Sequence, residues 1–342
     1  MKLTVNRSSR PATARVALAA LVLGTAGLAS CGGGTQVQTF AATRIIALGD
    51  ESSLINPDGS KYTHNAVVLD NTTTPPTPTT ALDCVSSPLW VQTVATAYGL
   101  VFPQCNPATV AAPTSRIYAS NGAKVADLAG QIDQHVASGG FVATDLVTVM
   151  VGPNDVVAQF AQYPAVGEAQ LGDALEQAGK AVAAQVNRLA DLGAKVLIAT
   201  IPDMGLTPFA GDRSTGSTNT NPAVLSRLSL RFNDALLANL RNDGHKIGLV
   251  QLDEYLKAVD RARINGAGSF FNTTLASCLP SAPLPTCTTR TLGNDGAAIP
   301  TPTIVNNASA ATWLWADATH LSAGGQSSFG SLAVTRARNN PF

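Results

Sequence analysis

The chain has 342 residues, and its 22 Lys and Arg residues balance 22 Asp and Glu residues to a formal net charge of 0. Hydrophobic residues make up 45% of the chain and charged residues only 13%, a composition that excludes an intrinsically disordered protein. Because there is no basic excess to neutralise phosphates, the composition also argues against nucleic-acid binding. The length allows one large domain or two ordinary ones.

The N-terminus has the pattern of an export signal. Basic residues without any acidic residue precede a 13-residue apolar run from Val16 to Leu28. As a helix, this run is too short to span a bilayer core of roughly 30 Å. A basic start followed by a short apolar run predicts a secretory signal peptide.

A cysteine follows the apolar run directly. The sequence Leu-Ala-Ser-Cys that ends at Cys31 resembles the bacterial lipobox, in which the cysteine is lipidated. We therefore expect residues 1–30 to be a signal peptide with a lipobox, and residues 31–43 to be a flexible, glycine-rich tether. The resemblance to bacterial lipoproteins further implies that Gly32, directly after the cysteine, sends the protein to the outer membrane, where it faces the periplasm or the outside. The alternative is an ordinary signal peptide in which Cys31 stands by chance.

The remaining cysteines are even in number, as export predicts. Of the three possible pairings we expect the local one, in which Cys84 pairs with Cys105 and Cys278 pairs with Cys287. A zinc site is the competing interpretation, but none of the four histidines lies near a cysteine pair in the sequence. We expect no metal and no cofactor.

The rest of the chain alternates between short apolar runs and helical patterns. Most of the runs are continuously apolar, which is typical of strands that are buried on both faces. Such an alternation predicts a parallel sheet covered by helices. The expected strands are residues 44–48, 116–119, 146–151, 195–200 and 246–252.

Three helices are clear in the sequence, and three other stretches lack a helical or strand-like pattern of apolar residues. The helices are expected over residues 168–192, from Asn221 to near Gly244, and from Ala323 to Val334. Long loops in compact domains are usually functional or disordered. We interpret the three irregular stretches as loop insertions at the rim of a single domain over residues 44–338; they are residues 56–88, 210–221 and 264–312.

Chemically active residues follow the ends of several expected strands. Ligands bind beyond the carboxyl ends of the strands in an open parallel sheet. The segments that follow those ends or precede the last helix are Gly49–Ser53, Ser120–Ala123, Gly152–Asp155 and Asp317–His320. Together they offer a hydroxyl, a backbone N–H at a glycine, a side-chain amide, a carboxylate and an imidazole. These are the groups that acyl transfer needs.

In this order, the four segments resemble the sequence blocks of the SGNH/GDSL hydrolases, a family of esterases and lipases. Gly49-Asp50 resembles the first block, Gly122 the glycine of the second, Gly152-Pro153-Asn154-Asp155 the third, and Asp317 with His320 the last. The resemblance spans about residues 44–335. It implies a three-layer α/β/α fold with a five-stranded, parallel, flavodoxin-like sheet. It also implies a serine esterase with Gly122 and Asn154 as oxyanion donors.

One position departs from the family pattern. The family has serine directly after Gly-Asp, whereas this chain has Glu51, followed by Ser52 and Ser53. Our preferred interpretation is a turn shifted by one residue, with Ser52 as the nucleophile, His320 as its base and Asp317 orienting the imidazole. The alternatives are that Glu51 replaces the nucleophile in a catalytically altered or inactive binding module, or that Ser53 takes the role.

The sequence narrows the partners but not the substrate. We expect a monomeric ester hydrolase that takes a small-molecule, lipid or acylated-sugar ester and binds no nucleic acid. Its membrane contact is the N-terminal lipid anchor. His64, His135 and His245 have no partner motif around them, and we expect all three to be structural.

Overall fold

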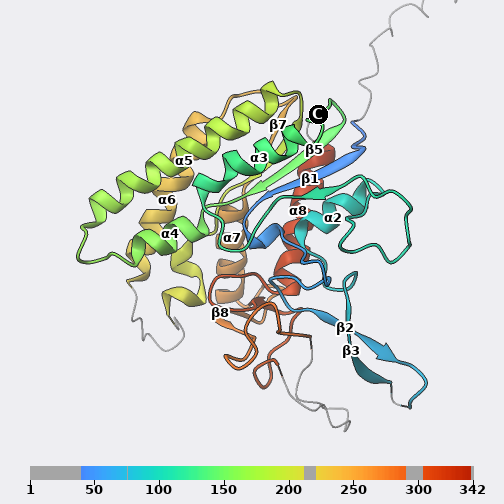
Figure 1. Ribbon diagram of the computed structural model, residues 1–342. Coiled ribbons are helices and arrows are strands. Elements are labelled where there is room, and N and C mark those ends of the chain that lie inside the picture. The colour runs from blue at the N-terminus through green and yellow to red at the C-terminus, as the bar shows by residue number, and fades with distance from the viewer. Residues whose placement is uncertain (1–39, 75, 212–220, 290–302, 340–342) are drawn as a thin grey trace, which may run out of the picture. The chain divides into compact units, whose positions relative to one another are not determined.

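A computed structural model describes residues 40–74, 76–211, 221–289 and 303–339, which belong to one compact unit beginning at Phe40. At the centre lies a five-stranded sheet in the order β4-β1-β5-β6-β7, and every neighbouring pair is parallel (Figure 1). In chain order this is 2-1-3-4-5, which confirms the predicted flavodoxin-like sheet. The strands are β1 (Arg44–Gly49), β4 (Arg116–Ile117), β5 (Asp145–Met150), β6 (Lys195–Ala199) and β7 (Ile247–Val250).

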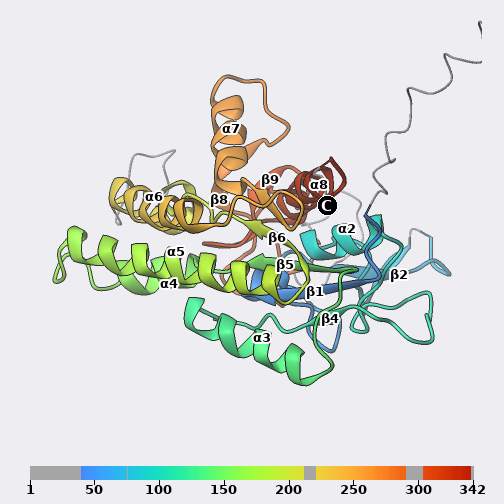
Figure 2. The ribbon, with the colours of Figure 1, turned by 90° about the horizontal axis from the view of Figure 1, so that it is seen from above.

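Helices cover both faces of this sheet. Figure 2 shows α3 on one side of β1 and β5, with α2 and α8 on the other. All six residues of β5 are buried, which explains why the strands are continuously apolar. The three-layer α/β/α fold is therefore confirmed. The helices are α2 (Trp90–Ala97), α3 (Leu128–Ala137), α4 (Pro153–Phe160), α5 (Glu168–Asp191), α6 (Pro222–Asn239), α7 (Leu252–Ile264) and α8 (Ala323–Asn339).

The predicted ends of two helices were wrong. Helix α8 continues to Asn339, past the predicted end at Val334. Helix α6 ends at Asn239, before the predicted end near Gly244, because Leu240 already has an extended backbone with a ψ of 137°. The helices α5 and α6 pack against each other along their length.

Two of the expected loop insertions contain strands. Strands β2 (Ala66–Asp70) and β3 (Thr77–Asp83) form an antiparallel hairpin within the first insertion, and β8 (Asn272–Ala276) pairs in parallel with β9 (Trp313–Trp315). Most of the second insertion and residues 290–302 of the third lie outside the described residues.

Both expected disulfides are confirmed. Cys84 pairs with Cys105 and Cys278 with Cys287, with Cα atoms 5.6 and 5.9 Å apart. Disulfides form and persist in oxidising compartments. Among the described residues, no helix is both long and apolar enough to cross a membrane.

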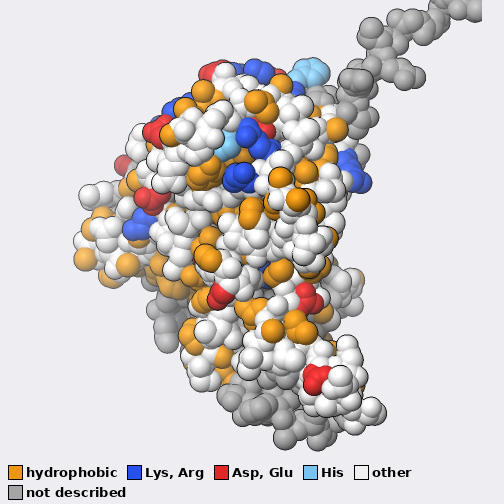
Figure 3. Space-filling model, turned by 45° about the vertical axis from the view of Figure 1, so that its right-hand side comes forward, with side chains coloured by type: hydrophobic (Ala, Val, Ile, Leu, Met, Phe, Trp, Pro, Cys, Tyr) orange, Lys and Arg blue, Asp and Glu red, His pale blue; other side chains and the backbone are white. Residues whose placement is uncertain are grey.

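The surface reflects the low charge content of the sequence. On the face drawn in Figure 3, uncharged polar and apolar side chains cover most of the area, and acidic and basic side chains are scattered among them. This face offers no continuous basic surface that could track a phosphate backbone.

Candidate active site

The site lies where the chain leaves the carboxyl end of β1. Gly49 ends this strand with a φ of +116°, and a Cβ atom there would lie 1.8 Å from the carbonyl oxygen of Met150 on β5. Only glycine allows so close an approach. The chain then turns at Asp50 into the short 3-10 helix η1 (Glu51–Ser53), whose first residue faces the end of the sheet.

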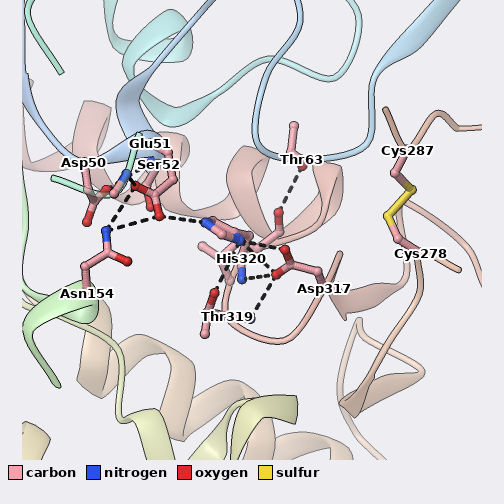
Figure 4. A network of polar contacts seen from close by, with 12 residues as sticks. Asp50, Glu51, Ser52, Thr63, Asn154, Cys278, Cys287, Asp317, Thr319 and His320 are labelled. Carbon is pink, nitrogen blue, oxygen red and sulfur yellow. Dashed lines mark hydrogen bonds and ion pairs between the residues drawn. A yellow bond between two sulfur atoms is a disulfide. The ribbon is translucent and has the colours of Figure 1, made fainter. Parts of the chain in front are cut away.

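The carboxylate of Glu51 occupies the centre of the site (Figure 4). Its side chain is only 8% exposed. Oε2 accepts a hydrogen bond from the backbone N–H of Gly122 at 2.8 Å. The amide of Asn154 lies 3.2 Å from Oε1 and 3.1 Å from Oε2. The two groups that we expected to serve as oxyanion donors therefore both contact this carboxylate.

The two donors are held by the loop and the helix that carry them. Gly122 has a φ of +73°, a left-handed conformation that glycine adopts at little cost and that turns its N–H toward Glu51. Asn154 lies in the first turn of α4, and its amide also donates to the carbonyl of Ala123 at 3.1 Å. The next residue, Asp155, accepts the N–H of Val125 at 3.0 Å, which ties the glycine loop to α4.

His320 faces Glu51 from the loop before α8. Its Nε2 lies 3.1 Å from Oε1 of Glu51, and its Nδ1 lies 2.8 Å from each oxygen of Asp317. The carboxylate of Asp317 also accepts the backbone N–H groups of Thr319 and His320. The tight turn therefore orients the carboxylate, and not a backbone carbonyl, toward Nδ1.

The geometry fixes the charge of the imidazole. A neutral imidazole has one N–H donor and one acceptor, and an acceptor nitrogen facing a carboxylate oxygen would repel it. Because both ring nitrogens of His320 face carboxylate oxygens, the ring carries both protons. Burial alone would lower the pKa of His320, but hydrogen bonds to Asp317 and Glu51 raise it to about 10.

The charges of the surrounding carboxyl groups follow from the same contacts. Burial, the largest single influence, favours the uncharged acid, but the hydrogen bond with His320, the charge of its ring and hydrogen bonds from backbone N–H groups together outweigh it and lower the pKa of both Glu51 and Asp317. Asp50 is fully buried, and burial, followed by the charge of Glu51, raises its pKa to about 7. Its Oδ1 caps η1 by accepting the N–H of Ser52, as a helix-capping residue does.

The structure does not bring the predicted nucleophile into contact with the base. Ser52 follows Glu51 on η1, and in the described part of the chain no hydrogen bond joins it to His320. Ser53 is fully buried, and its hydroxyl accepts the indole N–H of Trp90 at 3.1 Å. The turn is not shifted by one residue, so the side chain facing His320 is the carboxylate of Glu51. The contact with His320 that we predicted for Ser52 is therefore made by Glu51.

One neighbour of the site was missed in the sequence. The ring of Tyr62 lies against that of His320, with centroids 5.9 Å apart and planes tilted by 41°. Burial and the charge of Glu51 raise the pKa of its phenol. Tyr62 lies in the first loop insertion, where no motif marks it, and only the fold brings it to the site.

His64, two residues after Tyr62 in the sequence, lies among buried polar groups. His64 is fully buried, and its Nε2 lies 2.9 Å from the hydroxyl of Ser277. Among the described residues it forms one group with metal-ligand spacing together with Cys278 and Cys287. Both cysteines are joined in a disulfide, so their sulfurs are not available as thiolate ligands.

The fold and site together define a class of protein. An open parallel sheet carries, at its carboxyl edge, a carboxylate–imidazole–carboxylate chain with two hydrogen-bond donors. Apart from the first residue, the arrangement of these groups matches that of the base, the orienting group and the oxyanion donors in a hydrolase with a catalytic triad.

The comparisons with known proteins identify the family. The family model described as GDSL-like lipase/acylhydrolase matches residues 99–332, more than half of the chain. The chain therefore belongs to this family, whose chemistry is the hydrolysis of carboxylic esters. The match contains Gly122, Asn154, Asp317 and His320 and begins after Glu51. No curated protein matches the chain in sequence.

Several solved structures are similar in fold. An extracellular lipase from Streptomyces rimosus is 17% identical, with 87% of this chain and 100% of that one covered at a TM-score of 0.41. The acetyl xylan esterase AlAXEase is 14% identical, with 84% and 96% covered at a TM-score of 0.41. The acetylxylan esterase Axe2 from Geobacillus stearothermophilus is 13% identical, with 65% and 82% covered at a TM-score of 0.36.

Proposed function

We propose that this protein is an exported, lipid-anchored hydrolase in which the carboxylate of Glu51 takes the place of the family's serine. In this proposal Glu51 forms a covalent ester with the substrate, and the site then hydrolyses that ester. The family's chemistry is retained, but the ester that water cleaves is one that the enzyme makes on its own side chain.

One observation carries this proposal: the oxyanion donors point at Glu51 itself. Gly122 and Asn154 both contact its carboxylate, within 2.8 to 3.2 Å. In a serine esterase such donors stabilise the oxyanion that forms on the substrate. Here the same donors lie where an oxyanion would form if water attacked the carboxyl carbon of an esterified Glu51.

His320 fits the second half of such a cycle. Esterification removes the negative charge of Glu51, and with it one of the two carboxylates that keep the imidazole protonated. A neutral His320 is then a base beside the ester, and Asp317 holds its Nδ1. General-base catalysis of this kind contributes about 10²–10⁴-fold to a rate.

A second function is favoured by the same contacts. Gly122 and Asn154 already donate to Glu51, so a substrate carbonyl would find neither donor free. The same arrangement therefore fits a protein that binds a ligand without turning it over. The two functions differ in one measurable property, because only the hydrolase forms a bond to Glu51.

The position of Glu51 is tested with p-nitrophenyl acetate on four proteins: the wild type, Ser52→Ala, Glu51→Gln and Glu51→Ser. We expect slow and equal hydrolysis by the wild type and Ser52→Ala. Glu51→Ser restores the family residue beside His320, and we expect it to gain esterase activity. Rapid wild-type hydrolysis that is lost in Ser52→Ala would instead establish the serine mechanism at Ser52.

A further inference from the structure

The charges of Glu51 and His320 in the free protein restrict the kinds of bond that Glu51 can attack. The carboxylate is ionised and lies 3.1 Å from an imidazole that carries both protons. The free protein therefore holds a nucleophile and an acid side by side. A substrate that uses both must accept an electron pair at carbon and a proton at a leaving atom.

Attack at an acyl carbon does not suit a carboxylate. It would give an anhydride, which is more reactive than the ester from which it forms, so the step runs uphill. Attack at a saturated carbon gives an ordinary ester. This ester is stable enough to form and can be hydrolysed with the help of an oxyanion hole, which the site provides.

Glycosidic bonds do not suit the spacing. Retaining glycosidases hold their nucleophile and acid about 5–5.5 Å apart, and inverting enzymes hold their acid and base further apart, to accommodate the sugar. The contact between Glu51 and His320 leaves less room than either arrangement needs. In addition, a glycosyl intermediate is cleaved at the sugar carbon, where the donors on Glu51 give no help.

We propose that the substrate class is a small epoxide, opened by Glu51 at a ring carbon while His320 protonates the ring oxygen. This inference rests on the proposed covalent role of Glu51 and adds the substrate class. The ring oxygen leaves the attacked carbon as an alkoxide and stays attached to the neighbouring carbon, so it needs one proton, which the imidazolium supplies.

The cycle balances over two steps. In the first, a lone pair of the Glu51 carboxylate forms a C–O bond, the ring C–O bond breaks, and the proton of His320 passes to the ring oxygen. In the second, neutral His320 removes a proton from water, and the hydroxide attacks the carboxyl carbon of Glu51. The oxyanion, held by Gly122 and Asn154, collapses and expels the diol alkoxide, which takes its proton from His320. Glu51 is left as the carboxylic acid, and its proton passes to His320, which restores the resting pair. Overall, one epoxide and one water give one diol.

An alkyl halide fits this cycle less well. Halide leaves without a proton, so His320 is still protonated when the ester has formed and first has to lose its proton to become a base.

The surroundings of the reacting groups also bear on the substrate. The ring of Tyr62 against His320 adds an aromatic surface beside them. The side chains of Glu51 and His320 are only 8% and 15% exposed, so little of either group is accessible from solvent and we take the substrate to be small.

The test is a single turnover, with enzyme in excess, in water enriched in the heavy oxygen isotope. The probes are styrene oxide, epoxyhexane and bromohexane. We expect diol from the epoxides, with the heavy isotope in the peptide that contains Glu51 and not in the first diol released. We expect Glu51→Gln to abolish diol formation and His320→Gln to lower it by about 10²–10⁴-fold.

The outcomes separate the two proposals. Heavy isotope in Glu51 after bromohexane, without turnover of either epoxide, would overturn the substrate class and leave the covalent role of Glu51 intact. If no probe labels Glu51 in a protein that remains folded by circular dichroism, both proposals fail. Heavy isotope in the first diol would show direct attack by water and would overturn the covalent mechanism.

Discussion

At the scale of single residues, one substitution changes the chemistry of an otherwise familiar site. Glu51 brings a charge where the family has a neutral hydroxyl, and the surrounding groups respond to it. His320 is held as an imidazolium between two carboxylates, and the oxyanion donors point at a side chain of the protein. In the proposed mechanism the resting site therefore holds a nucleophile and an acid, whereas a serine triad holds a nucleophile and a base.

The charge of His320 is the first residue-scale prediction. We expect its imidazole to titrate near pH 10 in nuclear magnetic resonance spectra, because hydrogen bonds to Asp317 and Glu51 outweigh burial. Glu51→Gln removes one of these charges and should lower the midpoint. A midpoint near the ordinary value of 6.5 in the wild type would contradict the ion pair.

The same group links stability to pH. Since the folded-state pKa of His320 is raised, its contribution to the free energy of unfolding is fully present below pH 6.5 and is lost as the pH rises toward 10. The lowered pKa values of Glu51 and Asp317 act in the opposite direction, so their contribution is lost as the pH falls below about 4. We expect the difference in unfolding free energy between the wild type and His320→Gln to be largest between about pH 4 and pH 6.5. Urea titrations over a pH series measure it.

The oxyanion donors give a third prediction at this scale. Asn154→Ala should lower kcat by about 10²–10³-fold, since one donor to the developing oxyanion is lost. Asn187→Ala is a matched control, because that amide donates to the carbonyl of Asn239 and accepts the backbone N–H of Arg241, at the end of α6 and away from Glu51. Equal kcat values for the two variants in a turnover assay would exclude Asn154 from the site.

At the scale of elements, the strands could be predicted better than the insertions. Strands β1, β5, β6 and β7 are mostly buried on both faces, so they appear in the sequence as continuous apolar runs, whereas the edge strand β4 is more exposed. The β2–β3 hairpin has exposed positions and a Thr- and Pro-rich connection, so neither an apolar run nor a regular alternation marks it. The sequence also revealed Gly122, Asn154, Asp317 and His320 as candidates, because each follows an element boundary in a recognisable block.

The side chain that faces His320 could not be predicted in the same way. Glu51, Ser52 and Ser53 are consecutive, and the choice among them depends on the direction in which η1 starts. That direction is fixed by the contact of Gly49 with Met150 and by the cap at Asp50, both of which are tertiary features. Tyr62 escaped notice for a similar reason, because its partner His320 is far away in the chain.

The packing of α5 on α6 is testable at the element scale. A Cβ atom at Gly179 would lie 2.3 Å from the carbonyl oxygen of Phe232 and 3.0 Å from Cβ of Ala235. We expect Gly179→Ala to lower the free energy of unfolding by about 1–3 kcal/mol, as overpacking does. Gly130→Ala on the exposed side of α3 meets no atom within 4 Å and should raise stability by up to about 1 kcal/mol. Chemical denaturation that ranks the two variants in the reverse order would contradict the packing.

At the scale of the whole molecule, the disulfides and the N-terminal sequence both point to an exported protein. The disulfides close loops with sequence separations of 21 and 9 residues. In the chain-entropy model each contributes about 3 kcal/mol, slightly more for the wider loop. The proposed lipid anchor at Cys31 would then fix the position of the hydrolase in the cell envelope.

The anchor is tested by cell fractionation. In a bacterial host with a lipoprotein pathway, we expect the wild type in the membrane fraction, labelled by a radioactive or clickable palmitate. Cys31→Ser should lose the label and appear in the soluble fraction. Recovery of unlabelled wild-type protein in the soluble fraction would contradict lipidation.

The most direct test of the central claim is to trap the covalent intermediate on Glu51. The variant His320→Gln lacks the base that the second step needs, and p-nitrobenzyl bromide needs no proton for its leaving group. After incubation of the two, peptide mapping by mass spectrometry should find the nitrobenzyl group as an ester on Glu51, and the double variant with Glu51→Gln should lack it. The group on Ser52, or no modification of η1 in a folded protein, would contradict the account.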